Sequence, residues 1–307
     1  MINRELIRIK VVQLVYAYYQ NGGKTMETAE KEFIFSLDKA YELYHTLLLL
    51  IVSINHMATR TVEMYQSRAR RLREGEDIPT KFIDNRFAAQ LKANKQLKTF
   101  AAKYGILWDD EEDLLRQLYK EITKQEFYID YMHSCKSSYE EDRELWRRIY
   151  RTLLCNNERL DEILEDNCLY WNDDKVVIDT FVMKTIRRFE ERNGADQVLL
   201  PAYRSQEDLE FALKLFRTAI GNEEYFRKLI GEHTKNWEVE RMATMDLLIM
   251  QIAMAEITSC PEIPISVSIN EYVELAKMYS TPRSGGYING MLDTMAKRLI
   301  AEGVLEK

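Results

Sequence analysis

The chain has 307 residues, of which 46% are hydrophobic and 30% charged, a globular balance that excludes a compositionally disordered protein. Its formal net charge of -7 excludes a protein that attracts nucleic acid through the charge of its whole surface. Any nucleic-acid site must therefore be a local basic patch, or must be completed by a basic partner.

The spacing of cysteines and of apolar residues indicates whether the protein binds metal, is secreted or spans a membrane. The 4 cysteines are far apart and form no Cys-x-x-Cys pair, so we expect reduced thiols and no zinc site. The first ten residues carry charges where a signal peptide has its apolar core. The longest apolar run, 47–54, is far shorter than the roughly 20 residues that span a bilayer. We expect a cytoplasmic protein without a membrane span, metal or other cofactor.

Glycine and proline are scarce, at 11 and 5 residues, and neither occurs between residues 106 and 193. Such a stretch favours helices joined by short polar turns, and no alternating strand pattern with a hairpin turn is present. The sequence therefore predicts an all-α fold.

The first predicted helix, residues 1–20, is apolar on two sides. One face carries Ile7, Val11, Leu14, Val15 and Tyr18, and the other carries Ile9, Val12, Tyr16 and Tyr19. Such a helix is either central to a bundle or keeps one side for a partner, and a second copy of the chain suits it as well as another protein. Asn21 to Gly23 is expected to end it with a glycine cap.

The next predicted helices cover 26–74, 81–103, 111–134, 139–155, 157–168 and 174–193. After a loop, helices are predicted over 206–220, 222–235 and 239–258. Ser268 to Glu271 has the pattern of a capping box that opens the next helix, which ends near Tyr279. A turn over 280–286 and a last helix from about Tyr287 complete the chain.

Two stretches share an order of residues that suits a duplicated helical unit. Residues 160–189 contain Tyr170-Trp171 and then Asp179, and residues 226–257 contain Asn236-Trp237 and then Asp246. Chance similarity between two amphipathic helices explains the pattern equally well.

Motifs of catalysis are missing from the sequence. It contains no phosphate-binding glycine loop and no Gly-x-Ser-x-Gly elbow, and its 4 histidines are scattered. We therefore expect a protein that is not an enzyme.

Two blocks of sequence resemble the NusB family of transcription antitermination factors. The first is Arg4 to Tyr16. The second comprises Asn236 to Ala243, Asp246, Ile252 to Ile257, Ile263-Pro264, Ile269 to Glu271, Val273 to Lys277 and Tyr287 to Asp293. The order and spacing of these pieces over about 60 residues are specific. The resemblance covers about 1–20 and 205–300, and the family is usually about half as long as this chain.

The resemblance implies a NusB-like helical bundle enlarged by additional helices. Residues 1–45 are expected to pack with 205–307 as its core, and 46–204 to form a helical insertion, either new or a degenerate repeat of the core. Such a bundle would bind the boxA element of nascent ribosomal RNA together with NusE, a small-subunit ribosomal protein. In that family the pair acts in the transcription elongation complex and helps RNA polymerase pass terminators.

The resemblance also implies an RNA-binding surface, for which the matching residues are Arg4, Arg8, Lys10, Lys277, Arg283 and Tyr287. Arginine and lysine can hold phosphates, and an aromatic ring can stack on an unpaired base. The alternatives are ordinary surface charges for the arginines and a core position for Tyr287. The family's first helix usually has more arginines, and Glu5 and Leu6 occupy matching places here.

A second implied surface binds NusE through Tyr16 and Asp246. A carboxylate opposite a basic ribosomal protein is a favourable pairing, and core packing is the alternative for Tyr16. The acidic net charge and the few arginines also suit a second function, a helical scaffold that binds NusE or other elongation factors without binding RNA.

Overall fold

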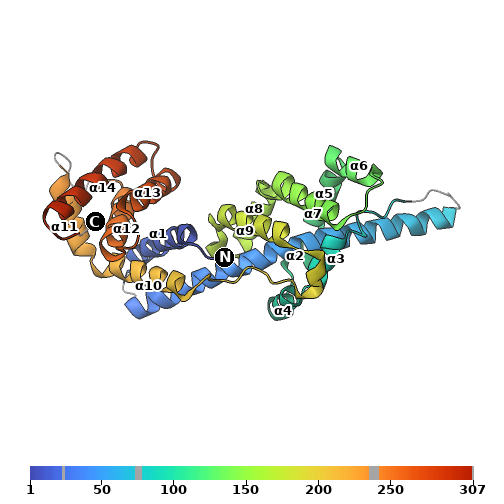
Figure 1. Ribbon diagram of the computed structural model, residues 1–307, viewed down its shortest axis with the longest axis horizontal. Helices are drawn as coiled ribbons and strands as arrows, with labels where there is room; N and C mark the ends of the chain where they lie inside the picture. Colours follow the sequence, from blue (N-terminus) through green and yellow to red (C-terminus); the bar gives the residue numbers. More distant parts are fainter. Residues whose placement is uncertain (23–24, 73–77, 235–241, 306–307) are drawn as a thin grey trace. The chain divides into compact units, whose positions relative to one another are not determined.

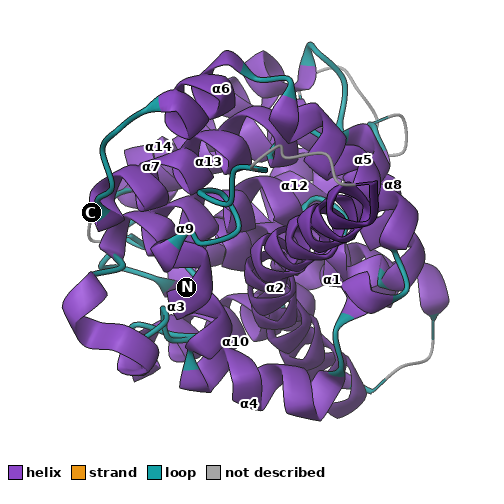
Figure 2. Cartoon of the chain, turned by 90° about the vertical axis from the view of Figure 1, so that its right-hand side faces the viewer, coloured by secondary structure: helices purple, strands orange, loops and turns teal. Residues whose placement is uncertain are grey.

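The computed structural model describes residues 1–22, 25–72, 78–234 and 242–305. In these ranges the secondary structure is entirely helical, with no strand, which confirms the predicted all-α class (Figures 1 and 2). The motif Asn236 to Arg241 and the predicted start of the 239–258 helix lie outside the described residues.

The α-helices divide the described chain as follows. Their bounds are α1 (Arg4–Asn21), α2 (Met26–Leu72), α3 (Arg86–Ala93), α4 (Lys95–Tyr104), α5 (Glu112–Thr123), α6 (Glu126–His133), α7 (Tyr139–Ile149), α8 (Glu158–Asn167), α9 (Asp174–Arg188), α10 (Gln206–Gly221), α11 (Glu223–His233), α12 (Thr244–Ser259), α13 (Ile265–Tyr279) and α14 (Ser284–Ala301). Short turns of 3₁₀-helix lie at Leu107–Asp109, Leu169–Trp171 and Glu191–Asp196, and a π-helical turn at Tyr150–Leu154 follows α7.

Tertiary contacts divide the chain into two compact units. Unit 1 contains Met1 and residues 39–202, and unit 2 contains residues 2–38 and 203–307. One boundary falls inside α2, and unit 2 is therefore built from two segments that are far apart in the sequence.

In unit 2 the core forms around α12. Every residue from Leu247 to Ile257 is buried, because α10, α11, α13 and α14 all pack against this helix. The start of α2 joins the same unit through Phe33, whose ring stacks on Phe216 of α10 at 4.6 Å. A helix buried on all sides needs to be mostly apolar, and α12 meets this requirement except at Asp246, Gln251 and Glu256.

Helix α1 has the two apolar faces that the sequence predicts, and both are buried as far as Val15. Asn3 caps its start by accepting the Leu6 N–H at 2.9 Å. Gly22 ends it with a φ of 51°, as predicted, a region that glycine enters without a Cβ clash. Tyr16 is 40% exposed, so the second face reaches the surface near its end.

In unit 1 several predicted helices are divided. The predicted helix 81–103 is wrong as a single element, since buried Asn94 ends α3 and begins α4, accepting the Leu97 N–H at 3.0 Å. Likewise 111–134 becomes α5 and α6, and α9 ends at Arg188 instead of reaching 193.

The π-helical turn that follows α7 leaves backbone carbonyls without helical partners. The ammonium of buried Lys175 donates to the carbonyls of Leu154 and Cys155, both at 2.8 Å, and to Asp179 at 2.9 Å. Asp179 also accepts the Tyr150 hydroxyl at 2.7 Å. This buried cluster therefore supplies hydrogen-bond donors to the backbone carbonyls at the end of the turn.

The predicted capping box at Ser268 is wrong. Helix α13 begins three residues earlier, at Ile265 directly after Pro264, and the Ser268 hydroxyl donates to Glu256 instead. Helix α14 likewise begins at Ser284 and not near Tyr287, so the turn before it is shorter than predicted. No helix in the described ranges combines the length and the apolar character needed to cross a membrane.

Candidate functional site

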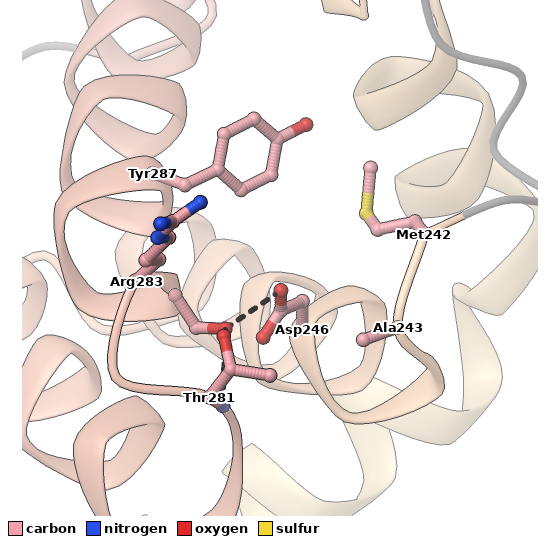
Figure 3. A pocket seen from close by; sticks show the side chains of 7 residues that line it. Met242, Ala243, Asp246, Thr281, Arg283 and Tyr287 are labelled. Atoms are coloured by element: carbon pink, nitrogen blue, oxygen red, sulfur yellow. Dashed lines mark hydrogen bonds between the residues drawn. The ribbon is translucent and has the colours of Figure 1, made fainter.

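A pocket of about 320 Å³ lies in unit 2, where the first turns of α12 and α14 meet. It is lined by Met242, Ala243, Asp246, Thr281, Arg283, Ser284 and Tyr287 (Figure 3). Three residues that the sequence assigned to two different surfaces, Asp246, Arg283 and Tyr287, therefore share one cavity.

Asp246 forms the floor of this pocket and is 8% exposed. The Ser284 hydroxyl donates to its Oδ2 at 3.0 Å, drawn as a dashed line in Figure 3. Ser284 in turn lies 2.8 Å from the Thr281 hydroxyl, so the turn before α14 holds one carboxylate oxygen. The other oxygen, Oδ1, is buried and has no hydrogen-bond partner among the residues that the structure describes.

Tyr287 and Arg283 form the outer part of the pocket. Tyr287 is 41% exposed, and both residues belong to the surface. Partial burial and the nearby charge of Asp246 raise the pKa of Tyr287, so its hydroxyl remains protonated at neutral pH. An aromatic ring beside an exposed guanidinium is an arrangement that can bind an unpaired nucleotide.

Lys277 lies beside the start of α14 because Gly285 permits a close approach. A Cβ at position 285 would lie 3.4 Å from the Lys277 Cγ. The Lys277 ammonium is paired with Glu274 at 2.6 Å, and its side chain is 56% exposed. This exposed pair contributes little energy, so a phosphate can compete for the ammonium.

Arg8, predicted to contact RNA, is instead 4% exposed in the core of unit 2. Its guanidinium donates twice to Glu256, at 2.8 Å each, and once to Glu271 at 3.0 Å. Burial alone would lower the pKa of Arg8, but the hydrogen bonds and charge of Glu256 outweigh it and raise the net value. A guanidinium bound in this way has a structural role.

The other two basic residues of α1 that were predicted to contact RNA, Lys10 and Arg4, differ in their exposure to solvent. Lys10 is fully buried, which does not fit a phosphate contact. Arg4 has a side chain that is 35% exposed; it lies 4.0 Å from Glu262 and 5.0 Å above the Phe211 ring. Arg4 is thus accessible, but it lies near the end of α12, about 20 Å along that helix from Asp246.

A second hollow of about 580 Å³ lies between α1 and α13, lined by Glu5, Arg8, Ile9, Glu271, Glu274, Leu275, Lys277 and Met278. Because Glu256 neutralises Arg8, the three remaining carboxylates outnumber the one ammonium. This hollow favours a basic partner over a phosphate backbone.

Sequence reasoning missed several residues of the site. Ser284 and Thr281 hold Asp246, and Glu256 holds Arg8, yet none of them was selected. Glu256 carries a usable signal, because an acidic residue in the stretch 247–257, which is otherwise apolar except for Gln251, needs a buried partner. In the described ranges, no group of three His, Cys, Asp or Glu residues could hold a metal ion.

Together, the helical fold and the pocket define an all-helical binding protein whose candidate site combines an aromatic ring, a guanidinium and a carboxylate. The model of the NusB family matches residues 180–297. The transcription antitermination protein NusB of Salinibacter ruber is 36% identical over 132 residues, covering 41% of this chain and 82% of that protein. The NusB of Koribacter versatilis is 40% identical over 116 residues, covering 36% of this chain and 80% of that protein.

The chain belongs to the NusB family, in a form longer than these relatives. A solved structure of NusB from T. maritima is 29% identical and covers 38% of this chain and 82% of that one, with a TM-score of 0.30.

Proposed function

We propose that this protein acts in transcription antitermination by binding boxA-type RNA together with NusE. The observation that carries the proposal is the pocket at the start of α14, where Arg283 and Tyr287 are exposed side by side. Similarity to antitermination proteins supplies the process. The proposal needs binding only and includes no catalytic step.

The RNA surface of this proposal is smaller than the resemblance implies. It consists of Tyr287, Arg283 and Lys277 around the start of α14, with Arg4 as an outlying contact. Amide N–H groups at the first turn of α14 add a partial positive charge that favours a phosphate. Arg8 and Lys10 are left out because they are buried.

A basic partner is needed because the whole chain is acidic. Three cationic side chains add little affinity against a net charge of -7. NusE would supply further positive charge and would contact the exposed Tyr16 and the acidic hollow between α1 and α13. An exposed tyrosine is a residue type often found at the centre of protein interfaces.

The direct test measures the affinity of the full chain for a short fluorescent boxA-type RNA, with and without NusE, across a salt series. We expect weak binding by the chain alone and tighter binding with NusE. Arg283→Ala should reduce the slope of log affinity against log salt by about 0.7, the value for one phosphate contact on a single strand. Tyr287→Ala should lower affinity with little change in slope, because stacking is not ionic.

A matched control is Lys297→Ala, which removes one exposed positive charge from the other end of α14. It should leave both affinity and slope unchanged. Equal effects of Lys297→Ala and Arg283→Ala would mean that only net charge matters, and the proposed RNA surface would be wrong.

A second function, a scaffold that binds NusE or other elongation factors without RNA, is favoured by one observation. Two of the predicted RNA contacts, Arg8 and Lys10, are buried. A stable complex with NusE that shows no RNA affinity at low salt would establish the scaffold and exclude RNA binding.

A further inference from the structure

The pocket at the start of α14 has a feature that general RNA binding does not use, the unpaired oxygen of Asp246. Oδ2 accepts a hydrogen bond from Ser284, whereas Oδ1 is buried and no residue within the described ranges donates to it. A buried carboxylate oxygen without a hydrogen bond costs free energy, so proteins usually supply a partner.

Two other buried aspartates, Asp142 and Asp179, have hydrogen bonds to both carboxylate oxygens. Asp142 accepts the Tyr131 hydroxyl on one oxygen and the Arg86 backbone N–H on the other, at 2.7 and 2.9 Å. Asp179 is likewise paired on both oxygens, by Tyr150 and by Lys175. Asp246 differs from both, because its Oδ1 has no donor among the described residues and Asp246 itself lines a pocket.

We propose that this pocket takes one nucleobase of the bound RNA and that Asp246 accepts a hydrogen bond from the base's exocyclic amino group. The proposal rests on the RNA binding proposed above and adds a base preference. Adenine, cytosine and guanine carry such an amino group. Uracil has no amino group. Its ring N–H lies between two carbonyl oxygens, and a carboxylate repels these oxygens.

The arrangement of groups in the pocket suits a nucleotide better than a basic side chain of a protein. The carboxylate is at the floor, the Tyr287 ring is at the wall, and the Arg283 guanidinium is at the rim (Figure 3). A base can stack on the ring while its phosphate meets the guanidinium. A lysine or arginine side chain in the pocket would lie near the like charge of Arg283, another lining residue.

A donor can reach Oδ1 only if the pocket wall moves slightly, and the wall is built to allow this. Ala243, Thr281, Arg283 and Tyr287 are all exposed, and Met242 is half-buried. Exposed side chains change rotamer without loss of core packing. The volume of about 320 Å³ accommodates a single base.

The test compares base replacements in a short boxA-type RNA that is bound to the full chain with NusE. Each cytosine is changed in turn to uracil and each adenine to hypoxanthine, which replaces the amino group by a carbonyl oxygen and adds a proton to the neighbouring ring nitrogen. Each guanine is changed to hypoxanthine, which removes its amino group. We expect one position at which this change lowers wild-type affinity roughly tenfold, the loss typical of one hydrogen bond to a charged group. In Asp246→Ala the amino and carbonyl forms should bind equally at that position.

Asp246→Asn gives a sharper readout. Ser284 can still donate to the amide oxygen, which leaves the amide NH₂ at the place of Oδ1. An NH₂ group donates and does not accept, so the preference at that position should turn toward the carbonyl form. Glu302→Ala, which removes an exposed carboxylate at the far end of α14, is the control and should keep the wild-type preference.

The possible outcomes separate this inference from the proposed function. Tight RNA binding with no amino preference, or with a preference unchanged in Asp246→Ala, overturns the inference and leaves RNA binding intact. The same holds if Asp246→Ala abolishes only the binding of NusE, since the pocket then takes a basic side chain. Failure of the wild-type chain to bind RNA in any condition overturns both.

Discussion

Arg8 and Arg4 show why side-chain roles are difficult to predict from sequence. They lie one turn apart on α1, and the sequence gives both the same role. The structure separates them, because Glu256, 248 positions further along the chain, binds Arg8 in the core. Each oxygen of Glu256 accepts a second donor, from Ser268 or Tyr272, at 2.7 and 2.9 Å. No local pattern reveals a partner at that distance in sequence.

Breaking this cluster should destabilise unit 2. Arg8→Ala leaves the Glu256 carboxylate buried without its cation, and we expect a loss of about 3–5 kcal/mol in the free energy of unfolding. Urea denaturation followed by circular dichroism measures it. Arg8→Met with Glu256→Leu removes both charges and should cost clearly less than Arg8→Ala. A double variant as unstable as the single one would show that the ion pair itself stabilises the unit.

The cysteines should differ in reactivity according to burial. Cys135 is exposed, whereas burial and the nearby charge of Asp179 raise the pKa of the Cys155 thiol to about 11. At pH 8 only about one Cys155 in a thousand is a thiolate, the reactive form. We expect iodoacetamide to label Cys135 first, and labelling of Cys155 to rise about tenfold per pH unit. Peptide mass spectrometry checks this; equal rates at pH 8 in the native protein would contradict it.

At the scale of elements, helix ends marked by glycine could be predicted from the sequence. The breaks that divide a predicted helix into two could not. Gly22 ends α1 as expected, because a glycine in the left-handed region is a local signal. Asn94 gave no such signal, since asparagine on a polar stretch is compatible with a helix. Its role depends on a tertiary hydrogen bond to the Gln197 carbonyl at 2.7 Å. Ser268 was misread for the same reason, as its partner Glu256 lies on another helix.

Asn94 should therefore contribute more to the free energy of unfolding than an ordinary helix cap. Asn157 caps α8 in the same way, with its Oδ1 accepting the Leu160 N–H at 2.9 Å, and its side-chain amide bonds only within its own segment. We expect Asn157→Ala to cost about 1 kcal/mol of unfolding free energy. Asn94→Ala should cost about 2–3 kcal/mol, since it also leaves a buried carbonyl unpaired. Chemical denaturation of both variants tests the order, and equal losses would refute it.

At the scale of the whole molecule, the predicted NusB-like core and its insertion lead to a proposal about architecture. The compact units divide at 38/39 and 202/203, close to the predicted bounds of the insertion, 46–204. We propose that unit 2 does not need residues 39–202 for folding. Unit 2 brings its two segments close to each other, since burial and the nearby charge of Asp38 together raise the pKa of Tyr203 to about 12. A short linker can therefore join them.

A shortened chain tests this proposal. Residues 39–202 are replaced by a short glycine-serine linker between Asp38 and Tyr203. We expect a helical protein that melts cooperatively and keeps the base preference and NusE binding of the full chain. Circular dichroism and the RNA assay measure both. A chain that remains unfolded would show that unit 1 is required for the fold of unit 2.

The discontinuity of unit 2 also affects the protein while it is being made. Helix α1 leaves the ribosome well before its partners α10 and α12, which follow only after residue 203. At about 5–20 residues per second, the 164 residues between Asp38 and Tyr203 delay their arrival by roughly 8–33 seconds. During that time unit 1, continuous from residue 39, can fold, while the two apolar faces of α1 remain uncovered. The nascent chain should therefore be a client of ribosome-associated chaperones until translation passes α12.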